Sequence, residues 1–207
     1  MTPANRRQVI VTAALEVFAE AGYDRASMRM VAKAAGITTP VLYDHFTSKA
    51  ELYAVLVEEQ ADSLINEWEG RGYAISDGGG VEDMFMETIG TILDWVSANP
   101  AGWRIVFLDA PSDPVVAEAH RGRQERATKV LAQQYARVPH LHLDVPILGR
   151  ERGEQFLAEA TKWTINAIAA WWWNNRDLRR EEVQTLAHNL LWTGLKYVTG
   201  DSGETLV

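Results

Sequence analysis

The sequence predicts an all-α protein, with three helices at the N-terminus and a larger helical domain after them. Apolar residues recur at intervals of three and four along most of the 207-residue chain, which is the period of a buried helix face. No segment shows the alternation of apolar and polar residues typical of a half-buried strand, and no internal repeat is present. Capping and turn signals between residues 22 and 51 divide the N-terminal part into separate helices.

A first helix is expected over residues 5–21. Gly22 ends it, and Arg6 and Arg7 lie at its start, either as a flexible arm that reaches phosphate or as a solvated first turn. Its apolar stripe consists of Ile10, Ala14, Val17, Phe18 and Ala21.

A short second helix is expected directly after it. Ser27 caps this helix by accepting from free backbone N–H groups. Gly36 stands where the helix ends, because glycine takes positive φ without a Cβ penalty. Ile37 follows as a buried anchor. Its apolar side consists of Val31, Ala32 and Ala35.

The third helix completes a helix-turn-helix, in which the second of two packed helices reads the DNA major groove. Thr38 or Thr39 caps it, and Pro40 fits its first turn. Leu42 and Phe46 stand at i and i+4 and therefore point inward together. The residues left to face outward are Thr38, Thr39, Tyr43 and His45.

Further helices are expected along the rest of the chain, and the first of them opens with a Ser48-x-x-Glu51 capping box. The triple glycine in residues 70–80 predicts a linker, and two prolines in residues 138–149 predict a loop. The expected ranges are 48–69, 81–97, 103–108, 113–137, 151–175 and 181–198.

The net charge of −8 is unevenly distributed along the chain. Residues 1–50 hold six Lys or Arg and four Asp or Glu, which leaves +2 there and −10 on the remainder. A basic end on an acidic body directs only that end toward phosphate. The pI near 5.2 is therefore compatible with a DNA-binding protein.

Residues 10–56, about a quarter of the chain, resemble the N-terminal domain of TetR-family transcriptional regulators. The resemblance runs from Ala13-Ala14 through Phe18 and Gly22-Tyr23 to Val31-Ala32 and Ala35-Gly36, and ends in Leu42-Tyr43-x-His45-Phe46-x-Ser48-Lys49. It implies a DNA-binding domain over residues 1–48, a connecting helix over 49–69, and a helical effector-binding and dimerisation domain over 70–207.

The resemblance implies DNA contacts for the outward residues of the third helix and for their neighbours. Hydroxyl, phenol and imidazole groups suit phosphate oxygens, and the threonine methyls could meet a thymine methyl. Asp44 either accepts from a cytosine amine or pairs internally with a base such as Arg29. The implied contacts are Ser27, Arg29, Thr38, Thr39, Pro40, Tyr43, Asp44, His45 and, on phosphate, Lys49.

Operator binding requires two such domains, so a homodimer on a palindrome is expected. The alternative is that the last two helices pack only within one chain. The aromatic triplet Trp171–Trp173 covers about 200° of its helix, so at least one ring is expected to meet a second subunit or a cavity. The expected dimer seam consists of Leu157, Thr161, Ile165, Ile168, Trp172, Leu190, Gly194 and Tyr197.

An effector cavity in the C-terminal domain is implied by the resemblance, with a plain helical core as the alternative reading of each residue. The effector is expected to be an apolar small molecule that shifts the connecting helix and releases DNA. Candidate walls are Met84, Trp95, Trp103, Phe107, Tyr135, Trp163 and Trp171.

No enzyme site is expected. The chain has no cysteine, Gly200-Asp201-Ser202-Gly203 stands in the tail, and His140-x-His142 stands in a loop without a third ligand nearby. No cofactor, metal, signal peptide or membrane span is expected, which favours the cytoplasm. We therefore expect a repressor, with a helical small-molecule carrier that binds DNA weakly or nonspecifically as the alternative.

Overall fold

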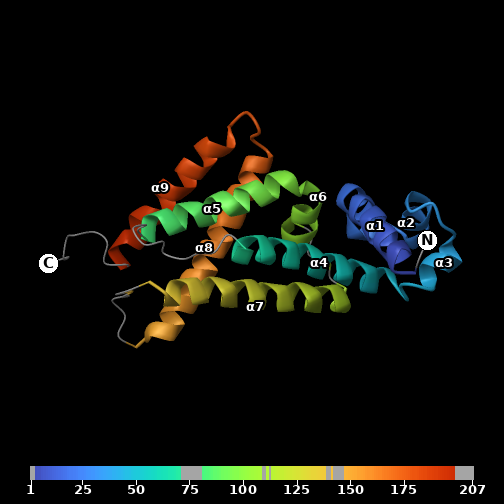
Figure 1. Ribbon diagram of the computed structural model, residues 1–207, viewed down its shortest axis with the longest axis horizontal. Coiled ribbons are helices and arrows are strands. Elements are labelled where there is room, and N and C mark those ends of the chain that lie inside the picture. The colour runs from blue at the N-terminus through green and yellow to red at the C-terminus, as the bar shows by residue number, and fades with distance from the viewer. Residues whose placement is uncertain are drawn as a thin grey trace. The chain divides into compact units, whose positions relative to one another are not determined.

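A computed structural model of the chain describes residues 3–70, 81–108, 111, 113–138, 141 and 147–198. These residues form helices and connecting turns with no strand among them (Figure 1), as the sequence predicts. No helix in this part of the chain is long and apolar enough to cross a membrane. The helices are α1 Pro3–Arg25, α2 Met28–Ala34, α3 Thr39–Tyr43, α4 Lys49–Gly70, α5 Val81–Ala98, α6 Pro100–Trp103, the π-helical η1 Arg104–Leu108, α7 Pro114–Ala136, α8 Arg150–Trp173 and α9 Arg180–Val198.

The chain divides into two compact units. Unit 1 comprises residues 1–63 and 98–124, and unit 2 comprises residues 64–97 and 125–207. The core of unit 1 is built from α1 to α4 together with η1 and the beginning of α7, and α6 and η1 pack against α1. Its largest fully buried side chains include Phe18, Leu42, Phe46, Tyr53 and Ile105.

The turn between α2 and α3 follows the local signals in the sequence. The Ser27 Oγ accepts from the Met30 N–H at 3.3 Å and so caps α2. At the other end Gly36 has φ +67°, its N–H donates to the Lys33 carbonyl, and the Ile37 N–H donates to the Ala32 carbonyl. These two hydrogen bonds form a Schellman motif, which ends α2 and sets the direction of α3.

The expected helices are present, with two differences in detail. Gly22 has φ +75° and ψ +161° inside α1, so the helical path is broken there and resumes for less than one turn before α2. The helix expected over residues 103–108 is instead α6 followed by the π-helical η1, and Asn99 precedes Pro100 in the first turn of α6. Of the linker predicted at 70–80, Gly70 is the last residue of α4 and the rest lies outside the described residues, as do most of the loop predicted at 138–149 and the tail around Ser202.

In unit 2, α5 and α9 are joined by a polar contact over a glycine. The Arg180 guanidinium donates to both carboxylate oxygens of Asp94, at 2.6 and 2.9 Å. The Gln184 side chain accepts from Arg180 at 2.5 Å and donates to the Met86 carbonyl at 2.9 Å. A Cβ at Gly90 would lie 2.8 Å from the Arg180 Nη2, so only glycine leaves room for this contact.

Candidate DNA-binding site

The α3 helix presents polar groups outward from a buried anchor. Leu42 and Phe46 are 0% and 1% exposed in the core of unit 1, which holds the helix in place. On the outer side Thr38 and Pro40 are exposed, Thr39 is half-buried, and Tyr43 is 49% exposed. Thr38 occupies the N-cap position, yet its side chain makes no capping hydrogen bond. Its hydroxyl therefore remains available to a phosphate or a base.

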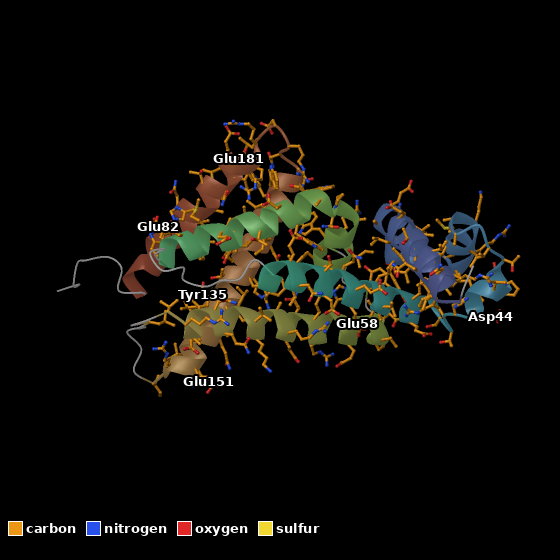
Figure 2. The ribbon with its side chains drawn as sticks, in the orientation of Figure 1. Asp44, Glu58, Glu82, Tyr135, Glu151 and Glu181 are labelled. Atoms are coloured by element: carbon orange, nitrogen blue, oxygen red, sulfur yellow. The ribbon has the colours of Figure 1, made fainter. Side chains whose placement is uncertain are left out.

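The beginning of α2 and the end of α3 hold the other implied contacts. Ser27 is half-buried and Arg29 is exposed. Asp44 lies at the end of α3 with its side chain exposed (Figure 2), and His45 is half-buried beside it. No ion pair joins Asp44 to Arg29, although both belong to the described part of the chain. The alternative in which Asp44 accepts from a cytosine amine therefore stays open.

Lys49 makes internal contacts at the beginning of α4. Its Nζ donates to the Tyr23 carbonyl at 2.9 Å and to the Ala26 carbonyl at 3.2 Å, and it lies 4.2 Å from the centre of the Tyr23 ring. An ammonium group has three N–H donors, and these two hydrogen bonds use two of them. The sequence reasoning assigned this group to phosphate alone and missed its role in joining α4 to the end of α1, since spacing does not reveal a contact to a distant carbonyl.

The two arginines near the N-terminus lie inside α1 and not in a separate arm. The Arg7 guanidinium lies 4.9 Å above the Phe46 ring and 3.6 Å from the Glu59 carboxylate. After α3, Ser48 caps α4 by accepting from the Glu51 N–H at 3.0 Å, as predicted. The Thr47 hydroxyl and N–H donate to the Glu51 carboxylate, and these hydrogen bonds hold its pKa below the ordinary value.

The predicted pocket residues differ widely in exposure. Trp95 and Trp103 are 0% exposed, and Phe107 is half-buried with the Arg123 guanidinium 4.9 Å above its ring. Tyr135 is buried between α7 and α8 (Figure 2), where it shares a 2.5 Å hydrogen bond with the Thr161 hydroxyl. By contrast Trp163 and Trp171 are 53% and 50% exposed. The side chain of Met84 lies outside the described residues.

A groove of about 510 Å³ lies between α7 and α8 in unit 2. Ala132 and Ala136 line it together with Lys129 and four glutamates, and none of the predicted aromatic residues borders it. One of those glutamates, Glu159, accepts from Lys162 at 2.9 Å. The groove is therefore a different feature from the predicted aromatic cavity.

The predicted dimer seam lies largely inside the chain. On α8, Leu157, Thr161, Ile165 and Trp172 are buried and Ile168 is half-buried, which corresponds to the alternative of packing within one chain. On α9, Leu190 and Gly194 are exposed, and the side chain of Tyr197 lies outside the described residues.

A second stripe of α8 is exposed, and the sequence reasoning did not single it out. It consists of Phe156, Ala160, Trp163, Ala167 and Trp171, which we name the outer stripe of α8. The spacing of four, three, four and four residues places them on one face of the helix. On α9, Leu186 and Leu190 are 54% and 66% exposed. Such apolar surface on a helix pair is typical of a protein–protein contact.

Among the described residues, no group of three His, Cys, Asp or Glu side chains is placed to hold a metal ion. His140 and His142, and the tail from Gly200 to Gly203, lie outside that part of the chain.

Comparison with known proteins agrees with the geometry of α2 and α3. The family model for bacterial regulatory proteins of the tetR family matches residues 10–56. The transcriptional activator FasR of Mycolicibacterium smegmatis is 25% identical over 194 residues, which is 93% of this chain and 84% of that protein. The transcriptional repressor AcnR of Corynebacterium glutamicum is 28% identical over 149 residues, which is 70% of this chain and 73% of that protein.

Solved structures have the same fold. The fatty acid degradation regulator FadR of Bacillus halodurans superposes with a TM-score of 0.76 at 17% identity, covering 95% of this chain and 98% of that one. GusR of Salmonella enterica has a TM-score of 0.74 at 21% identity, with the same coverage. FasR and AcnR, the relatives that match most of the chain, are both named as transcriptional regulators. Together with the helix-turn-helix of α2 and α3, these findings identify residues 10–56 as a DNA-binding domain of the tetR family of bacterial regulatory proteins, and the chain is similar over most of its length to transcriptional regulators.

Proposed function

We propose that the protein is a repressor that binds a palindromic operator as a homodimer and is released by an apolar small-molecule effector. The observation that carries this proposal is the outer surface of α3, where exposed polar groups stand on a helix that the buried Leu42 anchors to the core. In this proposal residues 1–48 bind DNA, α4 connects, and residues 70–207 bind the effector and dimerise. The protein acts in the cytoplasm, where it meets the chromosome.

On DNA, α3 lies in the major groove and the beginning of α2 lies against the backbone. Thr38, Thr39 and Tyr43 donate to phosphates or meet thymine methyls, and Pro40 makes apolar contact only. His45 contributes an imidazole at the edge of the same surface, and Asp44 accepts from a cytosine amine. Ser27 and Arg29 contact phosphates from α2, and Lys49 offers its third N–H donor to the backbone.

The dimer forms through the outer stripe of α8 and the exposed leucines of α9. Trp163 and Trp171 are about half exposed in the single chain, and large aromatic rings are the residues enriched in the centres of protein interfaces. Ala160 and Ala167 stand between these rings and permit close helix approach. Gly194 lies on the exposed side of α9 and serves the same purpose. A two-fold axis through this surface would present two α3 helices to a palindrome.

The effector is apolar, and within unit 1 the buried ring of Trp103 and the half-buried ring of Phe107 are its proposed walls. Buried aromatic side chains are typical linings of small-molecule sites. The direction of control is proposed as repression, as named for AcnR, although FasR is named an activator.

The test is fluorescence polarisation of the purified protein on DNA from directly upstream of its own gene, against a shuffled duplex of equal length. We expect binding to the native duplex to exceed the shuffled one by about 10³ or more. Tyr43→Ala should remove most of this preference. Lys129→Ala, which changes an exposed cation on α7, is the matched control and should leave it unchanged.

Other outcomes would separate the alternatives. Equal and steeply salt-dependent binding to both duplexes would leave only phosphate contacts and contradict a specific operator. No binding to any duplex would favour a helical small-molecule carrier. A reporter gene behind the bound fragment then distinguishes repression from activation, and sedimentation of Trp171→Glu against wild type tests the dimer.

A further inference from the structure

Tyr23 stands where three parts of unit 1 meet. Its ring is stacked on Phe18 at 6.2 Å and meets Tyr53 edge-on at 5.0 Å, so its position is fixed by the core. Its hydroxyl donates to the Asp113 Oδ2 at 3.0 Å, across 90 residues of sequence. One side chain at the end of α1 therefore contacts both the centre of unit 1 and the start of α7.

Asp113 uses its two carboxylate oxygens for two different partners. The Oδ1 accepts from the Val115 N–H at 3.0 Å and caps the first turn of α7. The Oδ2 accepts from Tyr23. A rotation of the Asp113 side chain that breaks one of these hydrogen bonds also disturbs the other. A change in the first turn of α7 therefore alters the hydrogen bond of the Tyr23 hydroxyl, and the reverse also holds.

On its other side Tyr23 is joined to the segment that follows α3. Lys49, the first residue of α4, donates to the Tyr23 carbonyl and lies over the Tyr23 ring. Only the residues from Asp44 to Ser48 separate Lys49 from the last residue of α3. A series of contacts thus runs from α7 through Asp113 and Tyr23 to Lys49, and the five residues from Asp44 to Ser48 connect Lys49 covalently to α3.

We propose that Tyr23 is a positioning residue that couples the first turn of α7 to the orientation of α3, so that a change at the start of α7 alters DNA binding without passing along α4. This inference rests on the proposed operator binding. The proposed coupling differs from a movement of α4 as a lever, because the contacts reach the DNA-binding helices at Tyr23, near the end of α1.

The Tyr23 hydroxyl keeps its hydrogen bond to Asp113 at all physiological pH values. Burial, followed by the hydrogen bond to Asp113, raises the pKa of Tyr23 to about 12, so the phenol stays a neutral donor throughout the physiological range. The coupling therefore responds to the position of Asp113 and not to pH.

Tyr23→Phe removes only this hydroxyl, since the ring contacts to Phe18, Tyr53 and Lys49 need no oxygen. Asp113→Ser keeps a good N-cap for α7 and removes the second oxygen that Tyr23 uses. Thr91→Val is the matched control, because it removes a hydroxyl from a fully buried side chain of α5 in unit 2.

We expect Tyr23→Phe and Asp113→Ser each to weaken binding to the operator duplex by about fivefold, and the double variant to be no weaker than either single one. Thr91→Val should stay within about twofold of wild type. Effects that multiply in the double variant would overturn the proposal, because they would assign the two side chains to independent roles.

Amide hydrogen exchange distinguishes coupling from a merely structural role of Tyr23, because only coupling makes the exchange rate in α7 depend on DNA binding. Binding of the same duplex should slow exchange in residues 115–120 of the wild type and of Thr91→Val. In Tyr23→Phe the slowing should persist in α2 and α3 and be lost in α7. Equal slowing in α7 of all three proteins would refute the coupling.

The free protein separates this inference from the proposed function. Without DNA, exchange of the first turn of α7 should be faster in Tyr23→Phe than in wild type and unchanged in Thr91→Val. If no duplex binds the wild type, operator binding is refuted, whereas unchanged exchange in free Tyr23→Phe refutes the link itself.

Discussion

Replacing Gly36 or Gly122 by alanine should change the free energy of unfolding in opposite directions. The two glycines have equally open surroundings but differ in their backbone φ angle. A Cβ at Gly36 or at Gly122 would meet nothing within 4 Å, so neither substitution causes a clash. Gly36 has φ +67° in the turn between α2 and α3, whereas Gly122 lies in the interior of α7. The sign of each effect therefore depends on φ alone.

The magnitudes follow from the cost of each conformation. An L-residue in the left-handed region costs about 1–2 kcal/mol, so Gly36→Ala should destabilise by roughly that amount. In a helix interior alanine is favoured over glycine by about 0.5–1 kcal/mol, so Gly122→Ala should stabilise. The two variants should differ by roughly 2 kcal/mol, which is about 4–8 °C in Tm for a chain of this length.

The assay is urea unfolding followed by far-UV circular dichroism, with wild type, both alanine variants and Gly36→Asn. Asparagine tolerates the left-handed region better than alanine, so Gly36→Asn should fall between wild type and Gly36→Ala. A shift of the midpoint in the same direction for Gly36→Ala and Gly122→Ala would refute the reasoning. So would an asparagine variant less stable than the alanine variant.

Substitutions at three further positions test other contacts. Burial, and then the nearby Arg123 charge, lowers the pKa of His120 from 6.5 to about 4, so the unfolded chain binds a proton that the folded chain does not. Stability is then full above pH 6.5 and falls toward pH 4, and the urea midpoint of His120→Gln should drop less between pH 7 and pH 5 than that of wild type. Ser27→Ala loses the cap of α2 and should cost about 1 kcal/mol in urea unfolding, whereas Ser27→Thr should cost less. Gly90→Ala places a Cβ 2.8 Å from the Arg180 Nη2, which is the end of a flexible side chain that can shift, so it should cost less than about 1 kcal/mol by thermal unfolding; a larger loss would show that the Arg180–Asp94 contact cannot move aside.

The helix-turn-helix could be predicted because its determinants are local. The cap at Ser27 and the positive φ at Gly36 each act over a few residues. Leu42 and Phe46 are one helical turn apart, so their shared inward direction follows from the period alone. Sequence order is therefore enough to place α2, the turn and α3.

The contacts of Tyr23 could not be predicted in the same way. Its hydroxyl partner is 90 residues away, and Lys49 is 26 residues from the carbonyl that it binds. An exposed lysine before an amphipathic helix and a lysine that holds a distant carbonyl have the same local sequence. Tertiary packing decides between these two roles. It also decides how many N–H donors of Lys49 stay available to a phosphate of DNA.

The two stripes of α8 show why the dimer surface was the harder prediction. Thr161 and Trp163 are two residues apart, and near the end of the helix Trp171 and Trp172 are neighbours, so apolar residues cover most of the circumference. Periodicity is compatible with either stripe and cannot rank them, and the sequence reasoning chose only the first. The chain's own packing buries Thr161 and Trp172 and leaves Trp163 and Trp171 about half exposed. A charge at Trp172 would therefore disrupt the folded chain, whereas a charge at Trp171 should separate subunits and leave each one folded, so the second substitution is the one that tests association.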